Sequence, residues 1–99
     1  DPGALMALAR LERDSGRDAE AMVLLRRVVL GEGHTAEAHL LLAELHTQRG
    51  ELEDAVYHLW QARDRDRRQP PLCDYAGRLR ALYQRLLAAP AGAPQAPGL

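Results

Sequence analysis

The side chains of this 99-residue chain that could carry chemistry are four histidines and one cysteine. His39 and His46 are seven residues apart and share one face of any helix that contains them, but two turns separate them. Two histidines of one helix that bind the same metal ion stand at i, i+4 or a similar spacing, which brings both within the roughly 2 Å length of a metal–nitrogen bond. We therefore expect both to pack within the fold, and we predict no metal site. The lone cysteine, Cys73, excludes an internal disulfide and is expected to pack as a small hydrophobic residue.

The sequence lacks the combinations of residues on which catalysis usually depends. No Ser or Cys stands beside a plausible base, no glycine-rich stretch has the spacing of a phosphate-binding loop, and no pair of carboxylates lies in an apolar segment. These observations predict a protein that is not an enzyme and that uses no cofactor.

Charge and hydropathy exclude further classes of function. The net charge is −1, so no basic surface for nucleic acid is evident. No apolar stretch approaches the roughly 20 residues of a membrane span, and no contact of this segment with a membrane is expected. Because the chain begins with Asp1 rather than Met, we expect a processed product or a fragment. The compartment stays open between the cytoplasm and, if an upstream anchor was removed, the periplasm.

The chain repeats itself with a period of 34 residues, which predicts a stack of helical hairpins. Residues 2–35 and 36–69 align without a gap and share small residues, apolar residues and a turn glycine at seven places: Ala4/Ala38, Leu8/Leu42, Ala9/Ala43, Leu11/Leu45, Gly16/Gly50, Ala21/Ala55 and Leu25/Leu59. Apolar residues at helical spacing in each unit indicate two helices separated by the glycine. The expected helices are 4–14, 18–30, 36–48 and 52–66. The alanines should let paired helices approach closely where they cross.

A third unit begins near residue 70 but does not complete a hairpin. Apolar residues from Leu72 to Leu86 form one stripe, which runs on to Ala88 before the Ala89–Pro90 pair ends the helix. A long amphipathic final helix commonly closes a helical stack, so we expect a capping helix over residues 70–88. Residues 89–99 are rich in Pro, Ala and Gly and carry no charge, which predicts a flexible tail. The predicted organisation is one all-α domain of about five helices over residues 1–88.

These features resemble the tetratricopeptide repeat (TPR), whose units are 34-residue helical hairpins. The family's large, leucine and small positions are filled in the first unit by Leu5, Leu8, Ala9, Ala21, Leu25 and Val28, and in the second by His39, Leu42, Ala43, His46, Ala55, Leu59 and Ala62. Most of the family's aromatic residues and its closing proline are replaced. The resemblance covers residues 2–69 and implies an α-solenoid that works as an adaptor or scaffold in protein–protein interactions.

The resemblance also implies a concave groove, lined by the first helix of each unit, that binds an extended or helical peptide. The residues at the corresponding positions are Met6, Arg10, Arg13, Glu37, Leu40, Glu44, Thr47, Asp74, Arg78 and Ala81. We expect a groove of mixed charge, with apolar spots at Met6 and Leu40, that binds a protein or peptide partner.

The opposite, convex side offers an alternative surface. Val23, Leu30, Tyr57 and Trp60 stand at positions that such repeats usually leave outside, and an exposed tryptophan near a tyrosine is typical of binding hot spots. The other interpretation of Trp60 is that it packs over the capping helix as part of the core. Two repeats are fewer than the three usually needed for stability. The alternative functions are therefore a scaffold that forms homodimers or larger homo-oligomers through this side, and a regulatory segment of a larger enzyme.

Overall fold

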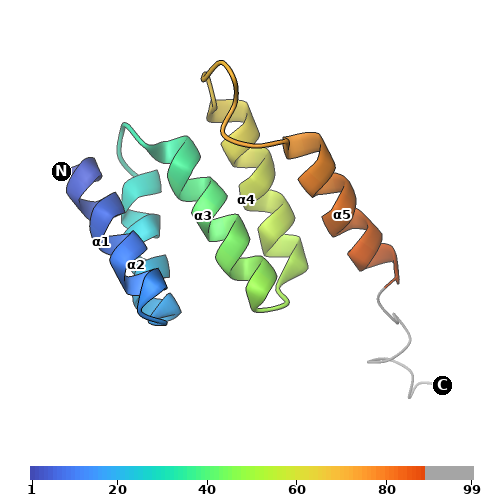
Figure 1. Cartoon of the computed structure of the whole chain (residues 1–99), viewed down its shortest axis with the longest axis horizontal. Coiled ribbons are helices and arrows are strands. Elements are labelled where there is room, and N and C mark those ends of the chain that lie inside the picture. Colours follow the sequence, from blue (N-terminus) through green and yellow to red (C-terminus); the bar gives the residue numbers. More distant parts are fainter. Residues whose placement is uncertain (89–99) are drawn as a thin grey trace.

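The computed structural model describes residues 1–88, and within them the chain forms five α-helices and no strand. The helices are α1 (Pro2–Asp14), α2 (Asp18–Val29), α3 (Thr35–Gln48), α4 (Leu52–Arg65) and α5 (Tyr75–Ala88). Each helix runs back alongside the one before it (Figure 1). The predicted all-α class is confirmed, as is the number of helices, whereas the tail predicted for residues 89–99 lies outside the described residues.

Two glycines close the two hairpins in the same way. Gly16 and Gly50 follow α1 and α3 with φ angles of +82° and +78°, a left-handed conformation that glycine adopts without steric penalty. At both turns, the N–H of the next residue donates to a carbonyl five residues earlier, at 2.8 and 2.9 Å. The ends of the first four helices consequently fall within two residues of their predicted positions.

The fifth helix begins at Tyr75, later than the predicted segment 70–88. Asp66 holds the preceding connection in a non-helical path, because its carboxylate accepts the N–H of Leu72 at 2.8 Å and the hydroxyl of Tyr75 at 2.6 Å. Asp74 then caps α5 by accepting the N–H of Gly77 at 3.0 Å. These carboxylate bonds, and not the apolar spacing, determine where α5 starts.

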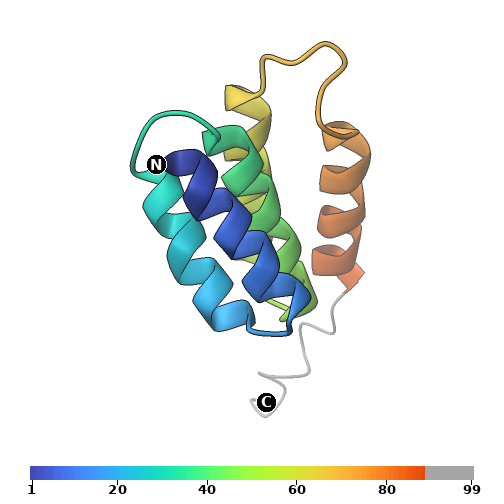
Figure 2. The ribbon, with the colours of Figure 1, turned by 60° about the vertical axis from the view of Figure 1, so that its left-hand side comes forward.

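Two clusters of buried side chains hold the helices together. The first joins α1 and α2 to one face of α3, where Leu42 and Leu45 are fully buried. The second joins the other face of α3, at Ala43, to α4 and α5. Figure 2 shows this succession of hairpins from a second side. The alanines predicted at the helix crossings are buried as expected, from 0% exposed at Ala21 and Ala55 to 3% at Ala43.

Leu8 does not take the buried role that its place in the repeat predicts. Leu8 is 44% exposed, whereas Leu42, its counterpart in the second unit, is 0% exposed. Leu42 packs in the cluster formed with α1 and α2, but α1 is the first helix of the row and nothing in residues 1–88 lies before it (Figure 1). Leu11 and its counterpart Leu45 differ in the same way, at 62% and 0%.

This difference predicts unequal effects of the same substitution. Leu42→Ala should lower the free energy of unfolding by about 2–5 kcal/mol, because it opens a cavity between the hairpins. Leu8→Ala, at the matching position of the first unit, should cost less than about 1 kcal/mol because the side chain is already half in water. Urea unfolding followed by circular dichroism measures both, and equal losses would contradict this description of the core.

Candidate functional site

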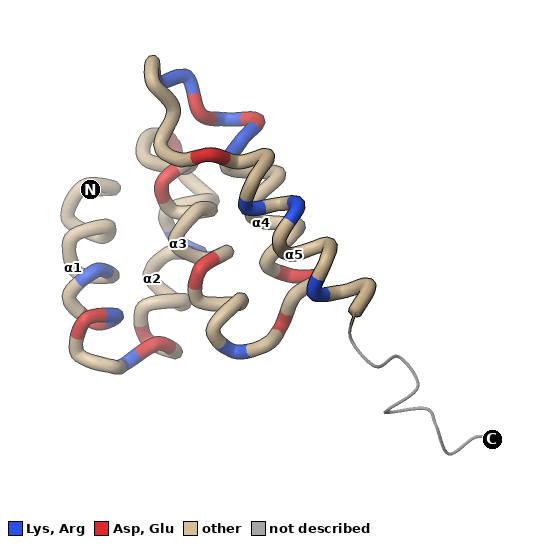
Figure 3. Tube along the Cα trace, turned by 45° about the vertical axis from the view of Figure 1, so that its right-hand side comes forward, with Lys and Arg blue, Asp and Glu red and all other residues tan. Residues whose placement is uncertain are grey.

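Glu44 of α3 connects the first helices of all three units. Its carboxylate accepts a hydrogen bond from Arg78 of α5 at 2.9 Å and lies 4.0 Å from the guanidinium of Arg13 of α1. The bond to Glu44 raises the pKa of Arg78. Figure 3 shows that acidic positions occur on α3 and basic positions on α1 and α5. Exposed ion pairs add about 0–1 kcal/mol each, so their main effect here is to fix the side chains.

Glu37, two turns earlier on α3, forms a second set of ion pairs. It lies 3.6 Å from Arg10, 3.3 Å from Arg68 and 2.8 Å from the ring N–H of His34. Partial burial favours the neutral carboxyl group, but the hydrogen bond from His34 and the two arginines outweigh it and hold the pKa of Glu37 below its ordinary value. The charged residues predicted on this face therefore largely neutralise one another.

An open hollow of about 360 Å³ lies between α3, α4 and α5. Its base is largely apolar and its rim is polar. The lining residues are Ala43, Glu44, Thr47, Gln48, Leu59, Arg78, Ala81, Leu82 and Arg85. The pair between Glu44 and Arg78 forms part of this rim. Such a site, with an apolar base and a few fixed polar groups, is suited to a side chain or short segment of another molecule.

Four of the predicted groove residues, Glu44, Thr47, Arg78 and Ala81, line this hollow together. Sequence reasoning missed Arg85, although it stands one turn beyond Ala81 on the same side of the predicted last helix. It also missed that Leu59 and Leu82, expected only as core residues, form part of the base.

The other predicted groove residues lie elsewhere. Met6 is 2% exposed, so its assignment to the groove is wrong: it stands one turn before Ala9 on the buried side of α1 and packs in the cluster shared with α2 and α3. Leu40 is half-buried against the second cluster. Arg10 and Glu37 pair with each other away from the hollow, and Arg13 lies 4.0 Å from Glu44 without lining the hollow itself. Asp74 serves as the cap of α5.

The four residues of the alternative surface are all exposed. Val23 and Leu30 are 56% and 87% exposed on and just after α2, and Tyr57 is 57% exposed on α4. Trp60 is 39% exposed and belongs to neither buried cluster, so its interpretation as a core residue is wrong. It still contacts the last helix, since its ring N–H donates to the hydroxyl of Tyr83 on α5 at 2.9 Å.

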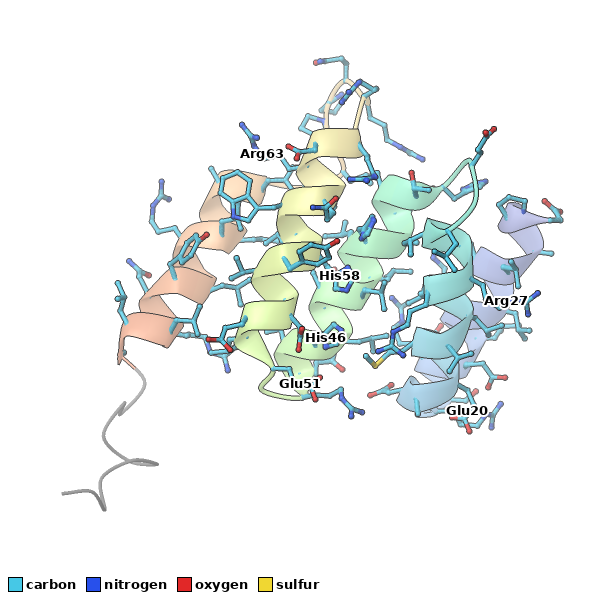
Figure 4. The ribbon with its side chains drawn as sticks, turned by 180° about the vertical axis from the view of Figure 1, so that it is seen from behind. Glu20, Arg27, His46, Glu51, His58 and Arg63 are labelled. Carbon is cyan, nitrogen blue, oxygen red and sulfur yellow. The ribbon has the colours of Figure 1, made fainter. Side chains whose placement is uncertain are left out.

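Three histidines gather on the side of α3 opposite the ion pairs. His39 and His46 of α3 both contact His58 of α4. The ring of His58 is stacked on that of His46 at a centroid distance of 5.3 Å (Figure 4). The Nδ1 atoms of His39 and His58 are 2.9 Å apart, so one of them must donate a proton that the other accepts. The spacing of His39 and His46 correctly places them on one face. His58 joins this cluster only because α4 packs against α3, and the spacing within one helix could not indicate that.

Two of these histidines are held in the neutral form. Burial lowers the pKa of His39 to about 4, with the charge of Arg65 acting in the same direction. Burial likewise lowers the pKa of His58 to about 4, with smaller contributions from His39, His46 and Arg26, against which Asp54 acts weakly. Both imidazoles are therefore packing groups at neutral pH.

His46, Glu51 and Asp54 form the only group among the described residues whose ligand atoms lie close enough for a metal ion, within 4.8 Å of one another. Imidazole and carboxylate are ligands that Zn²⁺ accepts. Glu51 is already engaged, since its Oε1 accepts hydrogen bonds from the ring N–H of His46 at 2.8 Å and from Arg49 at 3.2 Å, and these bonds lower the pKa of Glu51. Two of the three groups, His46 and Glu51, are thus already bonded to each other within the protein.

Comparisons of the chain with protein-family models, with curated proteins and with solved structures found no match. Within residues 1–88, every helix is too short or too polar to cross a lipid bilayer. The assignment of a function therefore depends on the geometry of the two faces of α3.

The histidine cluster predicts that acidification weakens the fold. The pKa values of His39 and His58 are about 4 in the folded protein, against an ordinary 6.5. Between these values the unfolded chain binds more protons than the folded one, so the histidines should leave the free energy of unfolding nearly constant from pH 7.5 to 6.5 and lower it as the pH drops toward 4. The slope contributed by each histidine is at most about 1.4 kcal/mol per pH unit.

His58→Gln should reduce this slope, because it removes one of the titrating rings. His34→Gln provides the matched control, since His34 is an exposed histidine with a carboxylate partner of its own. Urea midpoints measured at intervals from pH 7.5 to 4.5 give the slopes. A wild-type slope that His58→Gln leaves unchanged would show that the cluster does not control the pH dependence.

Proposed function

We propose that this chain is a protein-interaction module of the TPR kind, which binds a segment of a partner protein in the hollow between α3, α4 and α5. The single observation that carries the proposal is this hollow, with its apolar base and its polar rim. Its walls come from helices that are fixed by the core, so binding requires little rearrangement of the backbone. The mechanism is equilibrium binding without covalent chemistry.

The turn glycines and the alanines at the helix crossings support the assignment to the TPR kind, because each has the same structural role in both hairpins. The turn glycines adopt positive φ at equivalent points of both hairpins, and the alanines at the helix crossings are buried in both. The first helices of successive units are linked by ion pairs at Glu37 and Glu44, as expected if they form one continuous face.

The lining of the hollow indicates the chemistry of the segment that it accepts. Ala43, Leu59 and Leu82 offer apolar contact to a leucine-sized side chain at the base. At the rim, Arg78 is neutralised by Glu44, whereas Arg85 forms no ion pair with the residues that the structure describes. We therefore propose a partner segment that carries an apolar anchor followed or preceded by an acidic residue, which pairs with Arg85.

Homo-oligomerisation through the convex side is the alternative function, favoured by the exposure of Val23, Leu30 and Tyr57. Light scattering after size exclusion distinguishes the two, because a monomer has a mass of 11.0 kDa. A dimer that Val23→Glu with Tyr57→Glu converts to monomer would favour this alternative. A monomer at every concentration would exclude it.

A substitution in the lining of the hollow should weaken partner binding. Ala81→Glu places a charged side chain in the hollow and should lower the affinity for an anchored peptide at least tenfold. Ala76→Glu is the matched control, because Ala76 is an exposed alanine of the same helix that does not line the hollow.

The measurement is a selection of the wild-type chain against a random peptide library, followed by titration of the enriched peptides into the three proteins. Peptides with an apolar anchor beside an acidic residue should bind wild type and Ala76→Glu equally and should bind Ala81→Glu at least tenfold more weakly. Enriched peptides that bind all three proteins with the same affinity would place the binding surface elsewhere.

A further inference from the structure

The first helix of each unit carries the same apolar stripe, with residues at i, i+4 and i+7. In α3 the stripe is Ala38, Leu42 and Leu45, and in α5 it is Tyr75, Leu79 and Leu82. In α1 it is Ala4, Leu8 and Leu11, with Ala7 beside them. The α5 stripe lies 37 rather than 34 residues after that of α3, because the connection held by Asp66 delays the start of α5.

Two of these three stripes are covered by the hairpin that precedes them. The three α3 residues are each 0% exposed and share a cluster with Ala21, Leu25 and Val28 of α2. The α5 residues are 5–7% exposed and share a cluster with Ala55, Leu59 and Ala62 of α4. The covering helix in both cases presents a small residue, a leucine and a small or β-branched residue, again at i, i+4 and i+7.

The stripe of α1 has the same composition but is not covered by any residue that the structure describes. Leu8 is 44% exposed and Leu11 is 62% exposed, and Ala4 and Ala7 are exposed as well. The charged residues of α1 stand to the sides of this stripe, where Arg10 and Arg13 reach Glu37 and Glu44. An uninterrupted apolar stripe on an exposed helix face is unusual unless another surface packs against it.

We propose that the stripe Ala4, Ala7, Leu8 and Leu11 is a docking surface for a helical hairpin, which stacks on α1 as the α1–α2 hairpin stacks on α3. The chemistry of the occupant follows from the two covered stripes. Its second helix presents a small residue, a leucine and a small or β-branched residue at i, i+4 and i+7, as α2 and α4 do. In Figure 1, α1 lies at one end of the row of helices and α5 at the other. The stripe on α1 is therefore far from the hollow, which is lined by α3, α4 and α5.

The chain supplies its own probe for this surface. A second copy of residues 2–35, inserted before residue 2, places an α1–α2 hairpin in front of α1 in the register of the repeat. Pro2 of the original helix is changed to Ala in this extended protein, because Ala36 occupies the equivalent position in the second unit and a proline would disfavour a helical predecessor.

The extended protein should unfold in urea in one transition, with a midpoint raised by about 1 M or more and a steeper slope, because more surface is buried per molecule. Leu8→Glu with Leu11→Glu in the original α1 should abolish this gain. The same pair of substitutions in the unextended chain should leave its midpoint nearly unchanged, since both side chains are already exposed there.

Two results would overturn the proposal. The added hairpin could unfold in a separate transition at lower urea, or the glutamate pair could have the same effect in both proteins, and either would show that α1 does not accept a hairpin. Light scattering of the unextended chain adds a further check. A dimer that the glutamate pair converts to monomer would identify the occupant as a second copy of the chain instead.

Discussion

Helix α3 is packed on two sides, and the rest of the molecule depends on this packing. Leu42 and Leu45 bind it to the α1–α2 hairpin, while Ala43 receives α4 and α5. The polar side chains of α3 therefore lie on the two narrow strips of its surface between these contacts. Glu37 and Glu44 occupy one strip, and His39 and His46 occupy the other. The two faces of the molecule therefore differ in chemistry because one helix distributes its polar residues between them.

The polar groups on these two strips are stabilised in opposite ways. On the first, each carboxylate is charged and is matched by arginines from neighbouring helices, an arrangement that water and salt can still reach. On the second, burial keeps His39 and His58 neutral. Their uncharged rings pack against each other and share a hydrogen bond. A partner that brings charge is therefore accommodated far more easily beside Glu44 and Arg78 than beside the histidines, which agrees with the proposed position of the binding site.

The sequence allowed the helices to be predicted because their signals are local. Gly16 and Gly50 mark turns, and the spacing of apolar residues gives the lengths of the helices between them. The start of α5 could not be found in this way, because it depends on a hydrogen bond that the Tyr75 hydroxyl donates to Asp66 across the connection. Met6 was misplaced for a related reason: its position in the repeat indicated the groove, but the packing against α2 and α3 decided the outcome. The hollow was partly predicted, through Glu44, Thr47, Arg78 and Ala81, while its apolar base required the positions of α4 and α5.

The contrast between Leu8 and Leu42 shows why a repeat unit cannot be interpreted alone. Both residues hold the same position in their own hairpin, yet only the one that follows another hairpin is buried. Burial is thus a property of the junction between units. If a further hairpin stacks on α1, the new junction lies on the stripe of Leu8 and Leu11 and leaves Arg10 and Arg13 in their ion pairs with α3. Stacking would then lengthen the face formed by α1, α3 and α5 without obstructing the hollow at its other end, so the two proposed surfaces can be occupied at the same time.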